Sequence, residues 1–369
     1  MSPVRIAFYA PLKPPDHPVP SGDRRLARLF LDALDLAGHE PFVASTLRAY
    51  DETGARQREI AGDAEQTGDA LLRRWRDAPQ TAPDLWFTYH LYYKAPDWLG
   101  PRLSAALGIP YVVAEASHAA KRAGGPWDSG HRAVAAALRR ADAVLGVNPA
   151  DRDGVLPLLA DPRRWIALPP FLDSRAYRTL SRPPGGTVRL VAVAMMRPGD
   201  KLASYRLLGK ALAELGDLDW SLDVIGDGAA RAEVEAALRP VGARTRYRGA
   251  CDQNGVRAAL AEADLFVWPA INEAFGMALL EAQASGLPAV AGASGGIDAI
   301  VADGDTGTLA PPGDAAAFSE AVRRLIVDGA ARARMGRAAA AKVRREHDLP
   351  AAAARLDAVL RQLRPGRAA

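Results

Sequence analysis

Two glutamates, Glu273 and Glu281, stand eight positions apart at either end of a short apolar stretch. The spacing predicts a helix that begins near residues 274–276 and ends at about Ser285, with Gly286 as its stop. Eight residues of helix rise about 12 Å and turn about 80° past two full turns. The two carboxylates can therefore address opposite ends of one elongated ligand, while free N–H groups of the first turn suit an anion. A nucleotide-diphosphate sugar has this layout, with hydroxyls at both ends and negative charge in the middle.

The elements that must position these residues alternate between strand and helix along the chain. Short apolar runs between amphipathic helices indicate parallel sheets covered on both faces. The expected strands are 4–9, 42–45, 85–89, 111–115, 143–147 and 165–168 in the first half, and 188–194, 221–225, 245–248, 265–267 and 289–291 in the second. The expected helices are 23–37, 55–77, 95–107, 130–140, 151–159, 204–214, 230–238, 255–262, 315–326 and 349–363, besides the one that carries the glutamates.

A proline-rich connector divides this pattern into two doubly wound domains. We expect an N-terminal domain over 1–170, a linker over 171–187, a C-terminal domain over 188–345 and a last helical segment over 346–369. In open α/β sheets the carboxyl ends of the strands form the ligand-binding crevice. The two sheets therefore favour a ligand held between the domains.

Composition narrows the possible partners and compartments. The chain has 369 residues and a formal net charge of +4, and its 47 basic residues are dispersed among 43 acidic ones, which argues against nucleic acid as the main partner. A weak peripheral membrane contact is left open. A single cysteine, Cys251, excludes an internal disulfide and fits a reducing compartment. With neither a signal-peptide pattern nor a membrane-spanning apolar run, we expect a cytoplasmic protein. The oligomeric state is not readable.

Ordered segments of the second half resemble the retaining glycosyltransferases of family 4, also called glycosyl transferases group 1. The matching segments are Arg197 with Lys201, Gly226-Asp227-Gly228, Tyr247-Arg248-Gly249, the Glu273/Glu281 pair, Ser285-Gly286-Leu287-Pro288, Gly295-Gly296-Ile297 and Pro312-Gly313-Asp314. The match runs from about 188 to 330, whereas the first half matches only in layout. The resemblance implies a GT-B fold, in which two Rossmann-like α/β domains face each other across a cleft and the last helix returns to the N-terminal domain.

The resemblance assigns roles to the charged side chains. It implies that Arg197 and Lys201 bind the donor diphosphate, which a guanidinium fork and a point charge also suit chemically. It places Glu281 on the ribose hydroxyls. Glu273 would be catalytic, beside the reacting carbon of the donor sugar.

It also assigns backbone contacts. Phe275, Gly276 and Met277 would contact the sugar and the β-phosphate, and Gly22 would place its amide against the diphosphate at the start of a helix. The nucleobase would lie near Gly226, Gly228, Gly249 and Ala250.

A histidine at the carboxyl end of an N-terminal strand lies near the sugar in this family. Two candidates exist here: His118, which we prefer as the catalytic one, and His90. Glu115 and Lys121 lie near the same edge and are candidates for the acceptor site.

These assignments predict an enzyme that transfers a hexose or related sugar from a nucleotide-diphosphate donor, with retention, to an unidentified acceptor. A cell-surface polysaccharide or glycolipid precursor is the guess that family frequency favours. No Asp-x-Asp is suited to a divalent ion and no His/Cys cluster has ligand spacing, so we expect no metal and no cofactor. Two alternatives stay open, a nucleotide-sugar epimerase of the same fold and a non-catalytic protein that binds sugar nucleotides.

Overall fold

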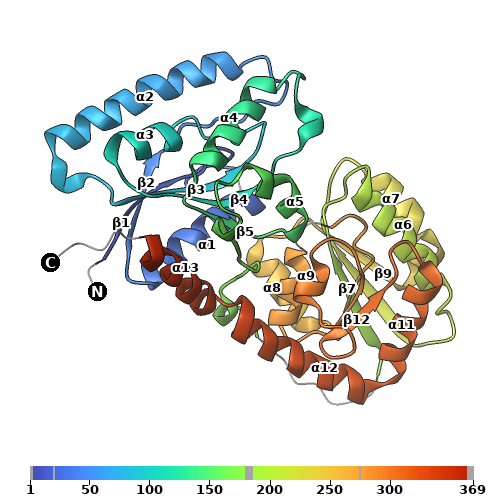
Figure 1. The fold of residues 1–369 in the computed structure, drawn as a ribbon. Helices are drawn as coiled ribbons and strands as arrows, with labels where there is room; N and C mark the ends of the chain where they lie inside the picture. The colour runs from blue at the N-terminus through green and yellow to red at the C-terminus, as the bar shows by residue number, and fades with distance from the viewer. Residues whose placement is uncertain (1–2, 20, 179–185, 274–275, 364–369) are drawn as a thin grey trace. The chain divides into compact units, whose positions relative to one another are not determined.

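The chain divides into two compact units, which we call the N-terminal unit (Met1–Pro169 with Leu349–Ala369) and the C-terminal unit (Pro170–Asp348). The computed structural model, shown in Figure 1, describes residues 3–19, 21–178, 186–273 and 276–363. Phe275, one of the predicted backbone contacts, lies outside these ranges. Each unit is described by itself.

The N-terminal unit is built on a parallel sheet. Within the described residues, its strand order is β2-β1-β3-β4-β5-β6. Helices cover both of its faces, so the central strands β3 and β4 are apolar along nearly their whole length. The strands are β1 (Arg5–Tyr9), β2 (Glu40–Ser45), β3 (Leu85–Leu91), β4 (Tyr111–Ala116), β5 (Ala143–Gly146) and β6 (Trp165–Ala167). The helices are α1 (Gly22–Leu36), α2 (Gln57–Asp77), α3 (Gly100–Leu107), α4 (Asp128–Arg140), α5 (Arg152–Val155) and α13 (Leu349–Leu363).

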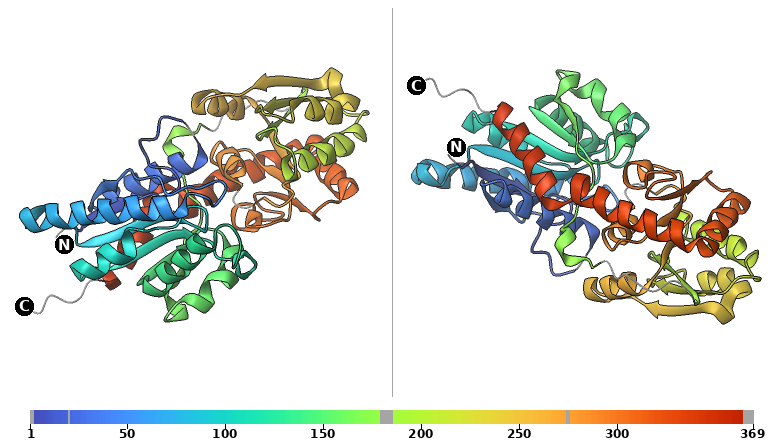
Figure 2. Two further views of the ribbon diagram at one scale, coloured as in Figure 1. Left: turned by 90° about the horizontal axis from the view of Figure 1, so that it is seen from above. Right: turned by 90° about the horizontal axis from the view of Figure 1, so that it is seen from below.

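The last helix, α13, belongs to the N-terminal unit although the whole C-terminal unit precedes it in sequence. It packs against α1, and Asp357 Oδ1 lies 3.4 Å from His39 Nε2. Figure 2 shows it running along this unit. Its apolar face is buried through residues such as Leu356 and Leu360. Burial of this face anchors the end of the chain.

Two helices of the N-terminal unit differ from expectation. The helix expected from Ala95 begins at Gly100, because Asp97 Oδ1 accepts hydrogen bonds from the N–H groups of Leu99 and Gly100 at 2.8 and 2.7 Å. The helix expected over 151–159 is one turn, α5, followed by a 3₁₀ turn at Leu156–Leu158. Pro157 stands at the start of that turn and cannot donate the N–H bond that would continue an α-helix.

The C-terminal unit repeats the architecture. The described residues form a parallel sheet with the order β12-β11-β10-β7-β8-β9. Its strands are β7 (Val188–Val193), β8 (Trp220–Ile225), β9 (Thr245–Gly249), β10 (Leu265–Trp268), β11 (Ala289–Gly292) and β12 (Gly307–Ala310). Its helices are α6 (Asp200–Ala213), α7 (Arg231–Leu238), α8 (Gln253–Glu262), α9 (Met277–Ala284), α10 (Ile297–Ile300), α11 (Ala315–Val327) and α12 (Gly329–Lys342). The strand β12 and the helix α12 were not expected from the sequence.

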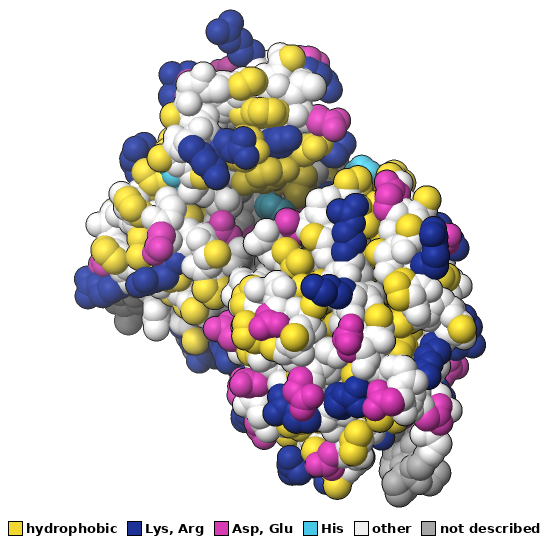
Figure 3. Space-filling view, turned by 90° about the vertical axis from the view of Figure 1, so that its right-hand side faces the viewer, with side chains coloured by type: hydrophobic (Ala, Val, Ile, Leu, Met, Phe, Trp, Pro, Cys, Tyr) yellow, Lys and Arg dark blue, Asp and Glu magenta, His cyan; other side chains and the backbone are white. Residues whose placement is uncertain are grey.

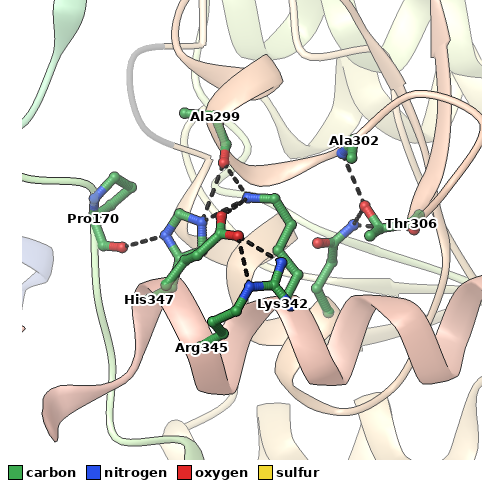
Figure 4. Close-up of polar contacts among 9 residues, drawn as sticks. Pro170, Ala299, Ala302, Thr306, Lys342, Arg345 and His347 are labelled. Atoms are coloured by element: carbon green, nitrogen blue, oxygen red, sulfur yellow. Dashed lines mark hydrogen bonds and ion pairs between the residues drawn. The ribbon is translucent and has the colours of Figure 1, made fainter. Parts of the chain in front are cut away.

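Polar contacts join the two ends of the C-terminal unit. After α12 the chain forms one π-helical turn, Val343–His347. Within it, the buried His347 places Nδ1 2.8 Å from the Pro170 carbonyl oxygen and Nε2 3.1 Å from that of Ala299 (Figure 4). Lys342 Nζ donates to the same Ala299 oxygen at 2.6 Å and pairs with Glu346 at 2.9 Å. The segments by which the chain enters and leaves this unit are thus fastened together.

Charge is mixed over the face that Figure 3 draws. In Figure 3, acidic and basic side chains are interspersed on the face that is shown, without a field of one sign. None of the helices in the described ranges has the length and hydropathy to cross a membrane.

Candidate functional site

A strained loop after β10 presents Glu273. Ala270 and Asn272 both have left-handed backbone angles, with φ of 54° and 48°. Such angles cost about 1–3 kcal/mol each in non-glycine residues and persist only where the surroundings impose them. Ser294 supplies one constraint, because its Oγ donates to the Ala270 carbonyl oxygen at 2.6 Å and accepts from the Glu273 N–H at 3.3 Å. A second comes from α6, where Ser204 Oγ accepts from the backbone N–H that follows Ala270, at 3.0 Å.

The carboxylate of Glu273 meets a cation. Its Oε2 forms a short ion pair with Lys201 Nζ, from the first turn of α6, and accepts from Trp268 Nε1–H at 3.2 Å. The Lys201 ammonium also lies 5.6 Å from the centre of the Trp268 ring, within range of a cation–π attraction. The lysine predicted on the donor phosphates and the glutamate predicted beside the sugar are therefore in direct contact.

Arg197, the other predicted phosphate ligand, is exposed in the loop between β7 and α6. Its guanidinium lies 2.7 Å from the Met195 sulfur. It stands four residues before Lys201, at the approach to the same helix. The structure thus places both predicted cations around the start of α6.

Glu281 has different surroundings from Glu273. It lies on α9, is only 5% exposed, and accepts a hydrogen bond from Gln253 Nε2 at 3.1 Å. The same Gln253 nitrogen donates to the Tyr177 hydroxyl at 3.1 Å. Gln253 is a contact that the sequence analysis missed; it opens helix α8, where a half-buried polar side chain leaves no periodic signal.

The N-termini of α9 and α6 have no side-chain cap. Gly276 is the N-cap of α9 with φ of 60°, and Gly199 is the N-cap of α6 with φ of 82°; neither offers a side-chain cap. A Cβ on Gly276 would lie 2.6 Å from Ile297 Cδ1, so space and backbone both require glycine there. The first-turn amides, which begin at Met277 in α9, can accept an anion.

The predicted base-binding turns pack against the same loops. Gly226 and Gly228 have φ of 140° and 150°, and Cβ atoms there would lie 1.9 and 2.4 Å from carbonyl oxygens of the loop after β7. Gly226 N–H donates to the Gly249 carbonyl oxygen at 2.8 Å, which joins the two turns. The residue after Gly249, Ala250, is exposed. These residues stand together at the carboxyl ends of β7, β8 and β9.

In the N-terminal unit, Gly22 is the first residue of α1. The N-cap is Ser21, whose Oγ accepts from the Arg24 N–H at 3.2 Å. Nothing lies within 4 Å of the position that a Cβ on Gly22 would take. The start of α1 therefore has room on the Cβ side of Gly22 for a ligand to approach the backbone.

Of the two candidate histidines, His90 is the one placed among charged groups. Its Nδ1 lies 3.1 Å from Asp23 Oδ1, at the start of α1, and 3.7 Å from Glu115 Oε1, at the end of β4. Burial opposes the charging of His90, but the carboxylates of Glu115 and Asp23 outweigh it and hold the pKa of His90 above its ordinary value of about 6.5. Burial raises the pKa of Glu115, and Asp23 and Asp151 add to that rise.

His118, the histidine preferred from the sequence, stacks on His131 with ring centres 4.3 Å apart. Burial, together with the neighbouring His131, holds the pKa of His118 below its ordinary value. Lys121 is exposed in a 3₁₀ turn just beyond it, at Ala120–Arg122. The sequence analysis missed Asp23 and Asp151. Each stands at the start of a helix that follows a strand, and this position could have identified them as candidates.

Among the residues that the structure describes, no group of three or more His, Cys, Asp or Glu side chains is arranged to hold a metal ion.

Residues 200–342 match the family model described as glycosyl transferases group 1. A D-inositol 3-phosphate glycosyltransferase of Streptomyces bingchenggensis is 30% identical over 225 residues, which cover 61% of this chain and 44% of that protein. The first curated relatives all align over less than half of their own length.

Solved structures match along almost the whole chain. Sucrose-phosphate synthase from Thermosynechococcus elongatus matches with a TM-score of 0.72 and 18% identity, covering 98% of this chain and 99% of that one. The Anabaena protein Alr3699/HepE, in complex with UDP and glucose, matches with a TM-score of 0.67 and 15% identity, covering 98% of this chain and 100% of that one. At these identities the likeness shows the fold, and the predicted GT-B fold with its two Rossmann-like α/β units is confirmed.

Proposed function

We propose that this chain, whose residues 200–342 match the family model described as glycosyl transferases group 1, transfers a sugar from a nucleotide-diphosphate donor to an acceptor, with retention at the anomeric carbon. The observation that carries the proposal is the contact between Lys201 and Glu273, beside the uncapped N-termini of α6 and α9. A cation, two helix ends and a carboxylate on one side of a sheet suit a substrate with a diphosphate next to a sugar.

The diphosphate is the leaving group, so its charge must be stabilised as the bond between the anomeric carbon and the phosphate oxygen breaks. Lys201 would exchange Glu273 for a phosphate oxygen, Arg197 would swing its exposed guanidinium onto the diphosphate, and first-turn amides of α9 would complete the site. The new bond forms between the anomeric carbon and an acceptor oxygen, whose proton passes to the departing phosphate oxygen. On this proposal the reaction needs no metal, because protein cations and amides neutralise the leaving group.

The two glutamates would serve opposite ends of the donor. Glu273, released from Lys201, would face the sugar and stabilise positive charge at the reacting carbon. Glu281 would take the two vicinal ribose hydroxyls, which requires its Gln253 partner to share or yield the carboxylate. UDP sugars are the first donors to test, since a structural neighbour binds UDP and glucose.

A thermal-shift screen against UDP-, GDP- and ADP-sugars tests donor binding. A ligand at 100 times its Kd should stabilise the protein by about 2.7 kcal/mol. Glu281→Ala should abolish the shift. A shift of the same size in this variant would remove the ribose assignment, and no shift with any donor would remove the proposal.

NMR of the sugar then separates transfer from the two other functions of this fold. Incubation with the donor and a panel of acceptors should give a glycoside with the anomeric configuration of the donor. Formation of an epimer without acceptor would identify an epimerase instead. Donor binding without turnover across the panel would identify a binding protein.

A further inference from the structure

The central strands of the N-terminal unit kink at the same register. Tyr89 pairs with Ala114 and Leu91 with Ala116, and the intervening residue of each strand, His90 or Glu115, has left-handed φ, 65° and 58° respectively. Non-glycine residues in this conformation cost about 1–3 kcal/mol each. Neighbouring strands that share such a kink bring both side chains to one edge, where His90 Nδ1 and Glu115 Oε1 are 3.7 Å apart.

Carboxylates outnumber cations at this edge. Asp23 contacts the His90 imidazole at 3.1 Å, and Asp151 acts on both His90 and Glu115 through space. Lys13 is a further cation that acts on Asp23. We call Asp23, His90, Glu115 and Asp151 the acid–imidazole cluster. Asp23 and Glu115 lie 3.1 and 3.7 Å from the imidazole nitrogen and Asp151 acts on it through space, so with the three carboxyl groups ionised the four side chains carry a surplus of negative charge even when the imidazole is charged.

One carboxylate oxygen of the cluster has no hydrogen-bond donor among the described residues. Glu115 is only 9% exposed, and its Oε2 has no hydrogen-bond partner among the described residues, although the Tyr89 hydroxyl interacts with the same carboxyl group. Buried carboxylate oxygens are normally paired, because leaving one without a donor costs free energy. A ligand group that enters beside His90 and donates hydrogen bonds would satisfy this oxygen. If the group is also positively charged, it would reduce the repulsion among the carboxylates.

The negative charge of the cluster indicates which kind of ligand group it would bind. A phosphate or carboxylate ligand would add to the repulsion, whereas a hydroxyl group supplies one donor and no charge. An ammonium group supplies three donors and one positive charge, so it satisfies several acceptors and offsets the surplus. Asp23 and His90 are 38% and 21% exposed at their side chains, which leaves a polar approach to the cluster.

We propose that the acid–imidazole cluster binds the ammonium group of the acceptor, which makes the acceptor an amine-bearing sugar or cyclitol rather than an anionic one. This inference rests on the proposed function, because it names the acceptor class of the same reaction. Strand ends in an α/β sheet are where ligands bind, and the cluster occupies the ends of β3 and β4.

Matched acceptors test the charge directly. A panel of amino sugars and aminocyclitols is compared with the N-acetylated form of each compound, and transfer from the UDP-sugar is measured as kcat/KM. The acetyl group removes the charge and leaves the other hydroxyls in place. We expect at least one free amine to be preferred over its acetylated form by tenfold or more. In Glu115→Gln and Asp23→Asn we expect that preference to fall several-fold, while the donor KM stays within twofold.

Asp161→Asn is the matched control, since Asp161 is a carboxylate of the same unit that pairs with Arg163 away from the cluster. It should keep the amine preference. Equal or absent transfer to both members of every pair would overturn the inference, as would a preference that survives in both cluster variants. Because the nucleotide-sugar thermal shift is measured on the same samples, a protein that binds donor without amine preference refutes only this inference. A protein that binds no donor refutes the proposed function.

Discussion

Lys201 Nζ and Glu273 Oε2 form an ion pair across 72 residues of sequence. Both side chains are largely buried, at 27% and 18% exposure, so water screens their attraction less than it would on the surface. In the absence of donor, each side chain therefore neutralises the charge of the other. On the proposed function, donor phosphates would compete with Glu273 for the ammonium, and binding of the donor would free the carboxylate to face the sugar.

Replacing Lys201 by methionine should weaken donor binding more than it lowers the stability of the fold. The variant loses a charge-assisted contact to phosphate, worth about 1.5–3 kcal/mol, so the donor Kd should rise by about 10- to 150-fold. Isothermal titration with a UDP-sugar and with UDP measures the effect. Lys210→Met is the matched control, because Lys210 is exposed near the other end of α6. Equal donor affinity in the two variants would contradict the phosphate assignment.

Glu273→Gln should separate binding from turnover. The amide can still accept from Trp268 Nε1–H, but it no longer holds Lys201 by charge. We expect UDP to bind as tightly as in the parent, or more tightly, because Lys201 is released. We expect kcat to fall by about 100-fold or more, the scale seen when a group that stabilises transition-state charge is lost. Titration and single-turnover kinetics measure the two quantities, and unchanged kcat would remove Glu273 from the reacting centre.

Gly276→Ala should damage both the fold and the donor site. The methyl group would meet Ile297 at 2.6 Å, and alanine disfavours the left-handed φ of 60°. We expect a loss of at least about 1 kcal/mol of unfolding free energy, together with weaker donor binding, because the α9 N-terminus shifts. Gly216→Ala, at a turn with open space, is the control in the same urea titration. Equal stability of the two variants would show that the turn accepts a side chain.

The strands were readable from the sequence because they are buried on both faces. Tyr111–Ala116, for example, is apolar except for Glu115, and an amphipathic helix follows almost every such run, so the type and order of the strands needed no tertiary information. The strand Gly307–Ala310 was missed since it is short and opens with glycine, and α12 was missed because its alanine- and arginine-rich sequence has no clear apolar face.

The sequence could predict a site residue only where its type and its place in a motif indicate a chemical role. Motif order placed Glu273 and Lys201 near a donor, but their contact depends on how α6 and the loop after β10 pack, 72 residues apart. The sequence places His90 and His118 alike at the carboxyl ends of strands of one sheet, so it gave no reason to prefer the one beside Asp23. That difference comes from the left-handed kink at His90, which no local pattern announces.

His347 should make the C-terminal unit lose stability in mild acid. Burial, with Lys342 beside it, holds the pKa of His347 below its ordinary value of about 6.5, despite its hydrogen bond with the Pro170 carbonyl oxygen. The unfolded chain therefore binds more protons in this range, and stability falls as pH drops below about 6.5. Urea unfolding at pH 7.5 and 5.5 should show a larger loss in the parent than in His347→Gln. A His17→Gln variant should behave as the parent, and equal pH dependence in all three proteins would refute the role of His347.

His90 should titrate in the opposite direction. Burial disfavours its charge, but the carboxylates of Glu115 and Asp23 prevail and raise its pKa, so the folded state binds the proton more tightly than the unfolded chain. Its contribution to stability is complete below about pH 6.5 and is lost as pH rises through the folded pKa. Imidazole NMR resonances measure that pKa directly, and Glu115→Gln should lower it, because one of the two charges at Nδ1 disappears. His118, stacked on His131, should give the same titration curve in both proteins. A His90 pKa that is unchanged in Glu115→Gln would show that the two side chains do not act on each other across the kinked strands.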